Sequence, residues 1–243
     1  MKFSFGIITN NNEKNVSLII DSIEKQQIPE YEIIIVGIQG INRKHTKCIS
    51  FDETHRSGWI TKKKNIITSN ANYENIVYMH DYIIFDDDWY NGFLKYGNDF
   101  DIVVNKIINT NGTRFRDWIL NFDFLNGMYF KVNENTSLHK PYSWEKHNNG
   151  LNINIPNNRP TIFLDYDDNG EKWQNYIYIS GSFFICKKYI MDKYPLNEIL
   201  LHNQGEDVEW SQRVRQEYKF SCNKYSTVNL LKYKSMTPPI IVK

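Results

Sequence analysis

Cysteine and net charge are both scarce in this chain, and each shortage excludes a class of protein. The three cysteines, Cys48, Cys186 and Cys222, form no Cys-x-x-Cys pair, which argues against a disulfide framework and against a zinc module. The 29 Lys and Arg side chains nearly balance 28 Asp and Glu, leaving a formal charge of +1. This balance argues against bulk electrostatic binding to duplex DNA or to an anionic membrane.

Long apolar runs are missing as well. No stretch approaches the roughly 20 apolar residues that a membrane-spanning helix requires. The first residues lead straight into a strand-like segment, without the apolar region and cleavage site of a signal peptide. We therefore expect a cytoplasmic protein with reduced thiols, no transmembrane segment and no nucleic-acid partner.

The first third of the chain alternates between strand and helix patterns. β-Branched apolar runs predict strands at 3–9, 32–36, 47–51 and 76–79. Apolar residues at helical spacing predict a helix over 16–26, capped by Asn12 or Asn15, and a second helix over 59–71. Near-continuous apolar strands separated by helices indicate an α/β fold with a mostly parallel sheet covered on both faces.

The remainder of the chain is less regular. Strands are expected at 102–104 and 176–186, and a helix over 205–218. Between them, residues 109–175 are polar, aromatic and rich in Asn, Gly and Pro, which predicts an irregular insertion with room for one hairpin. The last residues, 228–243, are expected to wrap the surface.

Polar residues follow each of the four early strands. In chain order these are Thr9, Asn10 and Asn11, then Gln39, then Asp52 and Glu53, and finally His80, Asp81 and Tyr82. Ligands of open parallel sheets bind beyond the carboxyl ends of the strands. The convergence of these groups at one edge therefore predicts a nucleotide site.

Asp81 is the candidate metal ligand at this edge, because it directly follows a buried strand. A hard divalent cation there would bridge the carboxylate to a diphosphate. A strand cap or turn at His80-Asp81 explains the local sequence equally well. Residues 165–168 (Asp-Tyr-Asp-Asp) form a rival acidic motif, for which a surface-loop or acceptor-side role is expected because it lies in the irregular insertion.

Two further motifs carry candidate chemistry. Lys62, Lys64 and Asn65 stand on the helix before the acidic segment and are candidates to contact phosphates or a donor carbonyl, with a solvated basic face as the alternative. Glu206 and Asp207 open the late helix and offer a base for an acceptor hydroxyl. Their alternative role is to stabilise the positive end of that helix.

Acceptor binding is assigned to residues near these motifs. Aromatic faces stack on sugar rings, although most aromatic residues belong to the core of any globular protein. The acceptor candidates are Trp173, Gly181, Ser182 and Trp210, because the tryptophans lie close in sequence to Gly181-Ser182 and to the late acidic pair.

The order of these motifs resembles the GT-A glycosyltransferases, specifically the broad glycosyltransferase family 2. Segment 7–10 (Ile-Ile-Thr-Asn) is similar to the family's first strand, and Lys64-Asn65 to its Lys/Arg-Asn helix motif. Segment 76–82 (Ile-Val-Tyr-Met-His-Asp-Tyr) corresponds to its strand and Asp-x-Asp motif. Glu206-Asp207, with Arg213 downstream, corresponds to its late Glu-Asp motif.

The resemblance implies a single GT-A domain over 1–243, with a Rossmann-like central sheet. Residues 1–108 would bind the nucleotide sugar, and 109–243 would bind the acceptor and carry the catalytic groups. It implies a UDP-sugar donor, a glycan or other hydroxyl-bearing acceptor, and Mn²⁺ or Mg²⁺ held by Asp81 and His80. Asp207, beside Glu206, would be the base of an inverting displacement.

The chain also departs from the family pattern. The family's usual acid after the second strand is missing, because residues 37–39 are Gly-Ile-Gln, and Asp52 is the candidate to replace it. The segment His80-Asp81-Tyr82 keeps only one of the two carboxylates of the Asp-x-Asp motif. No histidine follows His202, and the Gln-x-x-Arg-Trp motif of processive synthases is absent. Two alternatives stay open: a non-catalytic protein that binds nucleotide sugars or glycans, and a nucleotidyltransferase.

Overall fold

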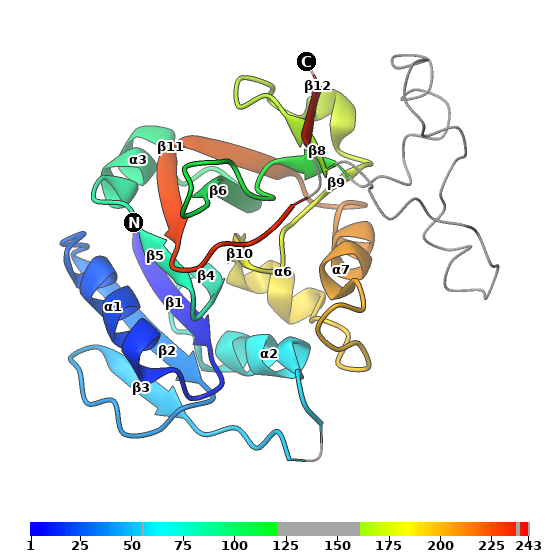
Figure 1. The fold of residues 1–243 in the computed structure, drawn as a ribbon. Helices are drawn as coiled ribbons and strands as arrows, with labels where there is room; N and C mark the ends of the chain where they lie inside the picture. The colour runs from blue at the N-terminus through cyan, green and yellow to red at the C-terminus, as the bar shows by residue number, and fades with distance from the viewer. Residues whose placement is uncertain (55, 121–160, 237–238, 243) are drawn as a thin grey trace.

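The structure is a computed structural model that describes residues 1–54, 56–120, 161–236 and 239–242. Its main sheet has eight strands in the order β3-β2-β1-β4-β10-β6-β11-β5 (Figure 1). The bounds in that order are β3 (Thr46–Ile49), β2 (Glu30–Val36), β1 (Lys2–Ile8), β4 (Asn75–His80), β10 (Phe183–Lys187), β6 (Ile102–Ile108), β11 (Phe220–Leu230) and β5 (Ile83–Phe85).

The strand directions decide where the site lies. The first four strands of this order are parallel, whereas β10 runs antiparallel to both β4 and β6. The carboxyl ends of β1 and β4 therefore meet the start of β10 at one edge of the sheet. There Ile8 is in register with His80, and the His80 amide donates to the Ser182 carbonyl at 3.1 Å.

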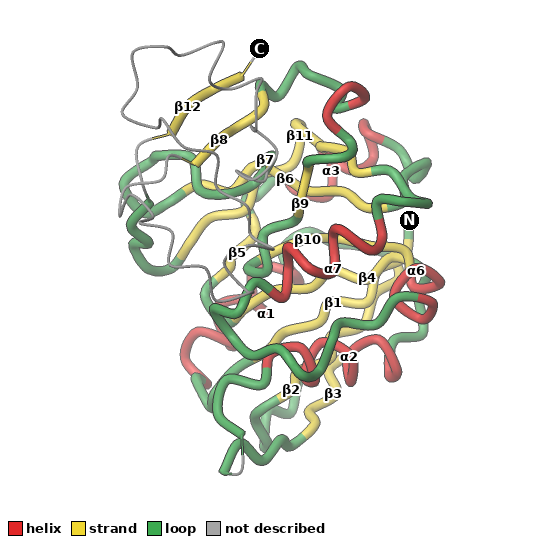
Figure 2. Tube along the Cα trace, turned by 90° about the vertical axis from the view of Figure 1, so that its right-hand side faces the viewer, coloured by secondary structure: helices red, strands yellow, loops and turns green. Residues whose placement is uncertain are grey.

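Helices cover both faces of this sheet. The core beside α1 (Glu13–Glu24) and α3 (Trp89–Tyr96) includes Phe5 and Ile7 of β1. The opposite face packs against α2 (Ile60–Asn70), α6 (Lys188–Lys193) and α7 (Glu206–Val214), which lie on the same side of the sheet in Figure 2. A methyl group at Gly6 would come within 2.3 Å of Ile67 Cγ2, so glycine there permits the close approach of α2. The predicted α/β class with a mostly parallel early sheet is confirmed.

A second, smaller sheet has the order β12-β8-β7-β9. Its strands are β12 (Pro239–Val242), β8 (Thr161–Leu164), β7 (Ile119–Leu120) and β9 (Ile177–Tyr178). β7 and β8 pair antiparallel within the predicted insertion, where the short 3₁₀ helix η2 (Glu171–Trp173) also lies. Residues 121–160, which make up most of that insertion, lie outside the described residues.

Two predicted elements are corrected by the structure. The strand expected over 176–186 is divided between β9 in the small sheet and β10 in the main sheet, because the chain turns through Ser180 to Ser182, where the Phe183 amide bonds the Ser180 carbonyl. The segment from residue 228 was expected to wrap the surface. Its first residues instead form the end of β11, where Val228 and Leu230 are buried and pair with β5. None of the helices in the described part of the chain has the length and apolar composition needed to cross a bilayer.

Candidate active site

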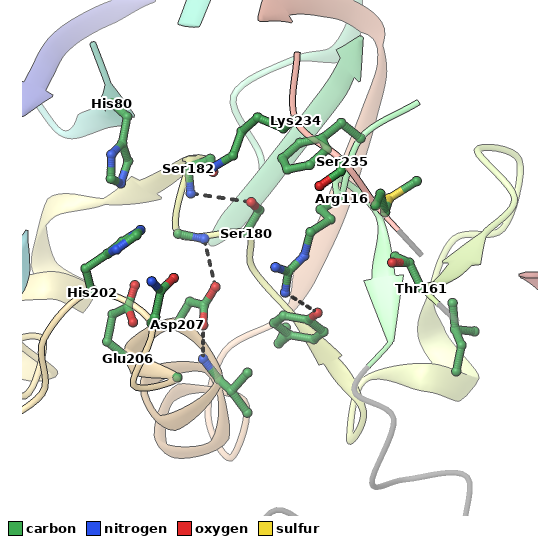
Figure 3. Close-up of a pocket in the computed structure, with 18 of the residues that line it drawn as sticks. His80, Arg116, Thr161, Ser180, Ser182, His202, Glu206, Asp207, Lys234 and Ser235 are labelled. Atoms are coloured by element: carbon green, nitrogen blue, oxygen red, sulfur yellow. Dashed lines mark hydrogen bonds between the residues drawn. The ribbon is translucent and has the colours of Figure 1, made fainter. Parts of the chain in front are cut away.

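A cavity of about 560 Å³ lies between the end of β4, the turn before β10 and the start of α7. Figure 3 shows the side chains around it, which come from both sheets. The residues predicted from sequence that line it are His80, Tyr82, Gly181, Ser182, Glu206 and Asp207. The structure thus brings the end of the fourth strand and the late acidic pair into one site.

Glu206 and Asp207 form the acidic wall of this cavity. Asp207 Oδ2 accepts a hydrogen bond from the Gly181 amide at 3.0 Å, and its Oδ1 accepts one from the Val208 amide at 2.9 Å. Glu206 is only 6% exposed. Burial, together with the neighbouring Asp207 charge, raises the pKa of Glu206. The pair therefore combines a carboxylate of fixed orientation with an acid that holds its proton more tightly than usual.

Lys64, on α2, contacts the turn that holds the acidic pair. Its side chain is buried, and Nζ donates to the Gly181 carbonyl at 2.6 Å. Burial lowers the pKa of Lys64, while the charges of Glu206 and Asp207 oppose that shift. The Gly181 peptide is thereby held on both sides, its oxygen by Lys64 and its nitrogen by Asp207. A solvated basic face does not describe this lysine.

The neighbouring side chains of α2 point to other partners. Lys63 Nζ donates to the Thr9 carbonyl and to Asn10 Oδ1, each at 2.6 Å, and it forms an ion pair with Glu53. Lys62 Nζ lies 2.9 Å from Glu198 Oε2. Lys63 therefore organises the loop after β1, whereas Lys62 contacts the segment that leads towards α7.

Asn65 also acts on that segment. Its side-chain amide donates to the Leu196 carbonyl at 2.9 Å and accepts from the Leu196 amide at 3.0 Å. The donor contacts predicted for Lys62 and Asn65 are thus occupied by structural contacts within the protein, and we leave both residues out of the proposed donor site.

The remaining predicted donor residues follow β1, β2 and β3. The Thr9 hydroxyl donates to Asp81 Oδ2 at 2.7 Å, which ties the ends of β1 and β4 together. The exposed side chains beyond these strands are Asn10, Asn11, Gln39 and Asp52. Asn11 has a left-handed φ of 61°, and Asp52 Oδ1 accepts from the Thr54 amide at 2.8 Å. These residues stand at the strand ends, where the prediction placed them.

His80 and His202 face each other with ring centroids 6.3 Å apart. Burial, followed by the charges of Lys64 and Lys234, lowers the pKa of His80 well below its usual value. This shift favours the neutral imidazole of His80. His202 is a cavity residue that sequence reasoning did not select, since it sits in a loop without a recognisable motif.

Tyr82 occupies the place where the family pattern has an acid. Its hydroxyl lies 3.0 Å from Ser182 Oγ and accepts a hydrogen bond from Lys234 Nζ at 3.0 Å. The ammonium groups of Lys232 and Lys234 lie 4.3 and 4.7 Å from the centroid of the Tyr82 ring. Both lysines follow β11, a strand that the sequence pattern does not predict, so the sequence gives no reason to place them at the site.

The predicted cation site does not fit these residues. Within the ranges that the structure describes, no three His, Cys, Asp or Glu side chains gather closely enough to hold a metal ion. Asp81 is engaged by Thr9, and positive side chains surround Tyr82, the next residue in the motif. A divalent cation favours clustered oxygen ligands and is repelled by fixed positive charge.

The tryptophans assigned to the acceptor belong to the core instead. Trp210 is fully buried, and its indole N–H donates to the Tyr194 carbonyl at 2.7 Å. Trp173 is 7% exposed and donates to Asp168 Oδ2 at 2.9 Å. This contact also occupies part of the rival acidic motif at 165–168, where Asp167 pairs with Lys224 at the surface. We therefore leave both tryptophans out of the acceptor site.

Arg116 and Tyr178 form a further wall of the cavity, next to the small sheet. Arg116 Nη2 donates to the Tyr178 hydroxyl at 2.9 Å. Arg116 precedes β7, and Tyr178 lies in β9. No sequence motif marks either residue, because they meet only through the pairing of β7 with β9.

Comparison with known proteins gives a clear result at the level of structure alone. No protein-family model matches the sequence, and no curated protein matches it. A crystal structure of S. aureus TarS matches with a TM-score of 0.58 and 14% identity over 95% of this chain and 36% of that one. TarS 1–349 in complex with UDP-GlcNAc gives a TM-score of 0.55 and 16% identity over 98% and 60%.

GalNAc-T7 with UDP, GalNAc and Mn²⁺ gives a TM-score of 0.59 and 13% identity over 96% of this chain and 44% of that one. This chain therefore has a glycosyltransferase fold of the GT-A type, as the resemblance implied. It spans less than two thirds of each of these neighbours. At such low identity, the likeness shows the fold and leaves the particular family and activity open.

Proposed function

We propose that this chain is a glycosyltransferase that moves a sugar from a nucleotide donor, a UDP sugar, to a hydroxyl group of a glycan or other acceptor. The observation that carries the proposal is the placement of the Glu206-Asp207 pair, fixed by the Gly181 peptide, in a cavity at the carboxyl end of β4. The complexes of TarS with UDP-GlcNAc and of GalNAc-T7 with UDP support the choice of donor. The proposed domain is the whole of 1–243, with the donor side in 1–108 and the acceptor side in 109–243.

Asp207 is the proposed base. An acceptor hydroxyl has a high pKa and needs a proton acceptor as it attacks the anomeric carbon. Two backbone amides hold the Asp207 carboxylate in a fixed orientation at the cavity wall, which favours one direction of proton transfer. The new C–O bond forms as the bond to the nucleoside diphosphate breaks, and attack opposite the leaving group inverts the anomeric centre.

On the donor side, Thr9, Asn10, Asn11, Gln39 and Asp52 are proposed to hold the nucleoside. They surround the carboxyl ends of β1, β2 and β3, where open parallel sheets bind nucleotides. Gly181 and Ser182 lie beside the acidic pair and are proposed to contact the acceptor. Metal assistance by Mn²⁺ or Mg²⁺ at Asp81 and His80 was expected, but because the described residues do not fit such a site, no step is assigned to a metal.

The proposal is tested by incubating the protein with a panel of nucleotide sugars and measuring release of the nucleoside diphosphate. We expect turnover with a UDP sugar and a loss of about 100-fold or more in Asp207→Asn, the size of effect typical of a general base. Glu209→Gln is the matched control, since this acid lies on the same helix and pairs with Arg213. Equal turnover in Asp207→Asn and the wild type would remove Asp207 from the mechanism.

A non-catalytic nucleotide-sugar-binding protein is the second candidate. It is favoured by the single carboxylate left in the His80-Asp81-Tyr82 motif. Calorimetry separates the two functions, because this candidate predicts binding of UDP sugars without release of UDP over long incubation with varied acceptors.

A further inference from the structure

Two lysines converge on the residue that follows the end of β4. Where β11 ends, the Leu231 amide donates to the Tyr82 carbonyl at 2.9 Å, which lays the following residues along Tyr82. Lys232 and Lys234 then reach over the Tyr82 ring, and Lys234 Nζ donates to its hydroxyl at 3.0 Å. Figure 3 shows Lys234 near Ser182, with the acidic pair on the other side of the turn.

The backbone of Lys234 is held in place by a buried side chain. Asn109 is 5% exposed, and its Nδ2 donates to the Lys234 carbonyl at 2.7 Å while its Oδ1 accepts from the Lys234 amide at 3.0 Å. One amide side chain therefore satisfies both backbone polar groups of Lys234, as a neighbouring strand would. The lysine enters the cavity wall from a fixed backbone position.

The charge of these lysines is not used by an acid of the described chain. Lys232 and Lys234 contact aromatic rings and the Tyr82 hydroxyl, and neither forms an ion pair within the residues that the structure describes. Arg116, also in the cavity wall, is engaged with Tyr178. Lys234 lines the cavity, and Lys232 lies over the ring of Tyr82, another lining residue, so the two ammonium groups form a site for an anion at the cavity wall.

The residue at position 82 indicates which kind of anion this site would bind. An acid at this position would pair with Lys234 and cancel its charge, whereas the Tyr82 hydroxyl accepts a hydrogen bond and leaves the charge in place. Two ammonium groups carry the same formal charge as one divalent cation. They lie beyond the carboxyl end of β4, where the phosphates of a nucleotide bind in open α/β sheets.

We propose that Lys234, with Lys232 beside it, binds the diphosphate of the nucleotide donor and takes the place of the divalent metal. This inference rests on the proposed function. As the acceptor oxygen bonds to the anomeric carbon, the bond from that carbon to the diphosphate oxygen breaks, and its electron pair stays on the phosphate. Asp207 receives the acceptor proton. Both lysines donate hydrogen bonds to the phosphate and stabilise the developing charge.

The experiment measures UDP and uridine binding by calorimetry, in EDTA and in Mn²⁺. We expect the wild type to bind UDP equally well in both, and Lys234→Ala to weaken UDP binding about tenfold or more, the loss of a charge-assisted hydrogen bond. Uridine, which has no phosphate, should bind both proteins alike. Lys95→Ala is the matched control, because Lys95, on α3, also places Nζ over a tyrosine ring, 4.0 Å from the centroid of Tyr225 in β11.

Each outcome bears on a different claim. UDP binding that requires Mn²⁺, or that is unchanged in Lys234→Ala, overturns the role of the lysines and leaves the proposed function standing. If the wild type binds no nucleotide in either buffer, the proposed function itself is wrong. Lys234→Arg keeps the charge and should retain most of the affinity, and thermal melting of each variant checks the fold.

Discussion

The Gly181 amide donates a hydrogen bond of 3.0 Å to Asp207 Oδ2, so the turn before β10 orients the acid at the start of α7. These residues are far apart in the sequence, and they belong to different elements. The position of the proposed base therefore depends on the backbone of the turn as well as on its own helix, and changes in that turn should alter turnover.

Gly181→Ala tests this dependence directly. A methyl group there would lie 3.1 Å from Glu206 Oε1, which is close enough to displace Glu206 by a few tenths of an ångström, and in ordinary contact with Asp207 Oδ2 at 3.4 Å. We expect turnover to fall about tenfold, since small displacements of catalytic groups are costly. Steady-state kinetics and UDP calorimetry are the measurements. Unchanged turnover would show that the acids adapt without loss.

Lys64→Met should change the pH dependence of the reaction. The Lys64 charge opposes the rise in the pKa of Glu206, so its removal raises that pKa further. We expect the limb of the pH–rate profile that reports the ionisation of Glu206 to move to higher pH. Lys172→Met is a suitable control, because Lys172 is an exposed lysine near Trp173. A profile that stays in place would exclude charge coupling between Lys64 and the acids.

Glu206→Gln should affect stability in a pH-dependent way. The folded protein binds the Glu206 proton more tightly than the unfolded chain does, since the pKa of this carboxyl is raised from its ordinary value of 4.5. The stability that this proton contributes is present below the unfolded pKa and is lost as pH rises through the raised folded pKa. Glutamine cannot ionise, so the melting temperature of the variant relative to the wild type should be higher at about pH 8 than at about pH 4. Thermal melts at both pH values measure this, with Glu209→Gln as the comparison. A relative melting temperature independent of pH would contradict the raised pKa.

Thr9→Val should loosen the contact between the ends of β1 and β4. The Thr9 hydroxyl donates to Asp81 at 2.7 Å and accepts from the Asn12 amide at 3.0 Å, and valine keeps the shape without these bonds. We expect a loss of about 1–3 kcal/mol in the free energy of unfolding, because two hydrogen bonds of the buried Thr9 hydroxyl are lost. Urea denaturation measures it. Thr46→Val, at the edge strand β3, should change stability by less than about 0.5 kcal/mol.

The early part of the fold is predictable because its signals are local. Apolar runs and helical spacing place β1 to β4, α1 and α2 within a few residues of their observed bounds, and Asn12 caps α1 by accepting from the Asn15 amide. The later part depends on pairings between distant segments. The division of 176–186 between two sheets follows from the partners of β9 and β10, which no local pattern contains.

The candidate site shows the same distinction between local signals and contacts between distant segments. Glu206 and Asp207 were identified because an acidic pair at a helix start is a visible motif, and the structure places both in the cavity. Trp210 and Lys234 show what the sequence leaves open. An indole ring suits a core or a sugar equally well, and a lysine after an unpredicted strand has no context that assigns it to a cavity.

Lys63 and Lys64 are consecutive residues of α2, yet one holds the loop after β1 and the other holds the peptide beside Asp207. A helix transmits displacement along its length with little internal deformation, so a shift of α2 reaches both places at once. A displacement of the loop at Asn10 would therefore also shift the peptide that orients Asp207, so the two sides of the proposed site are mechanically coupled through one helix.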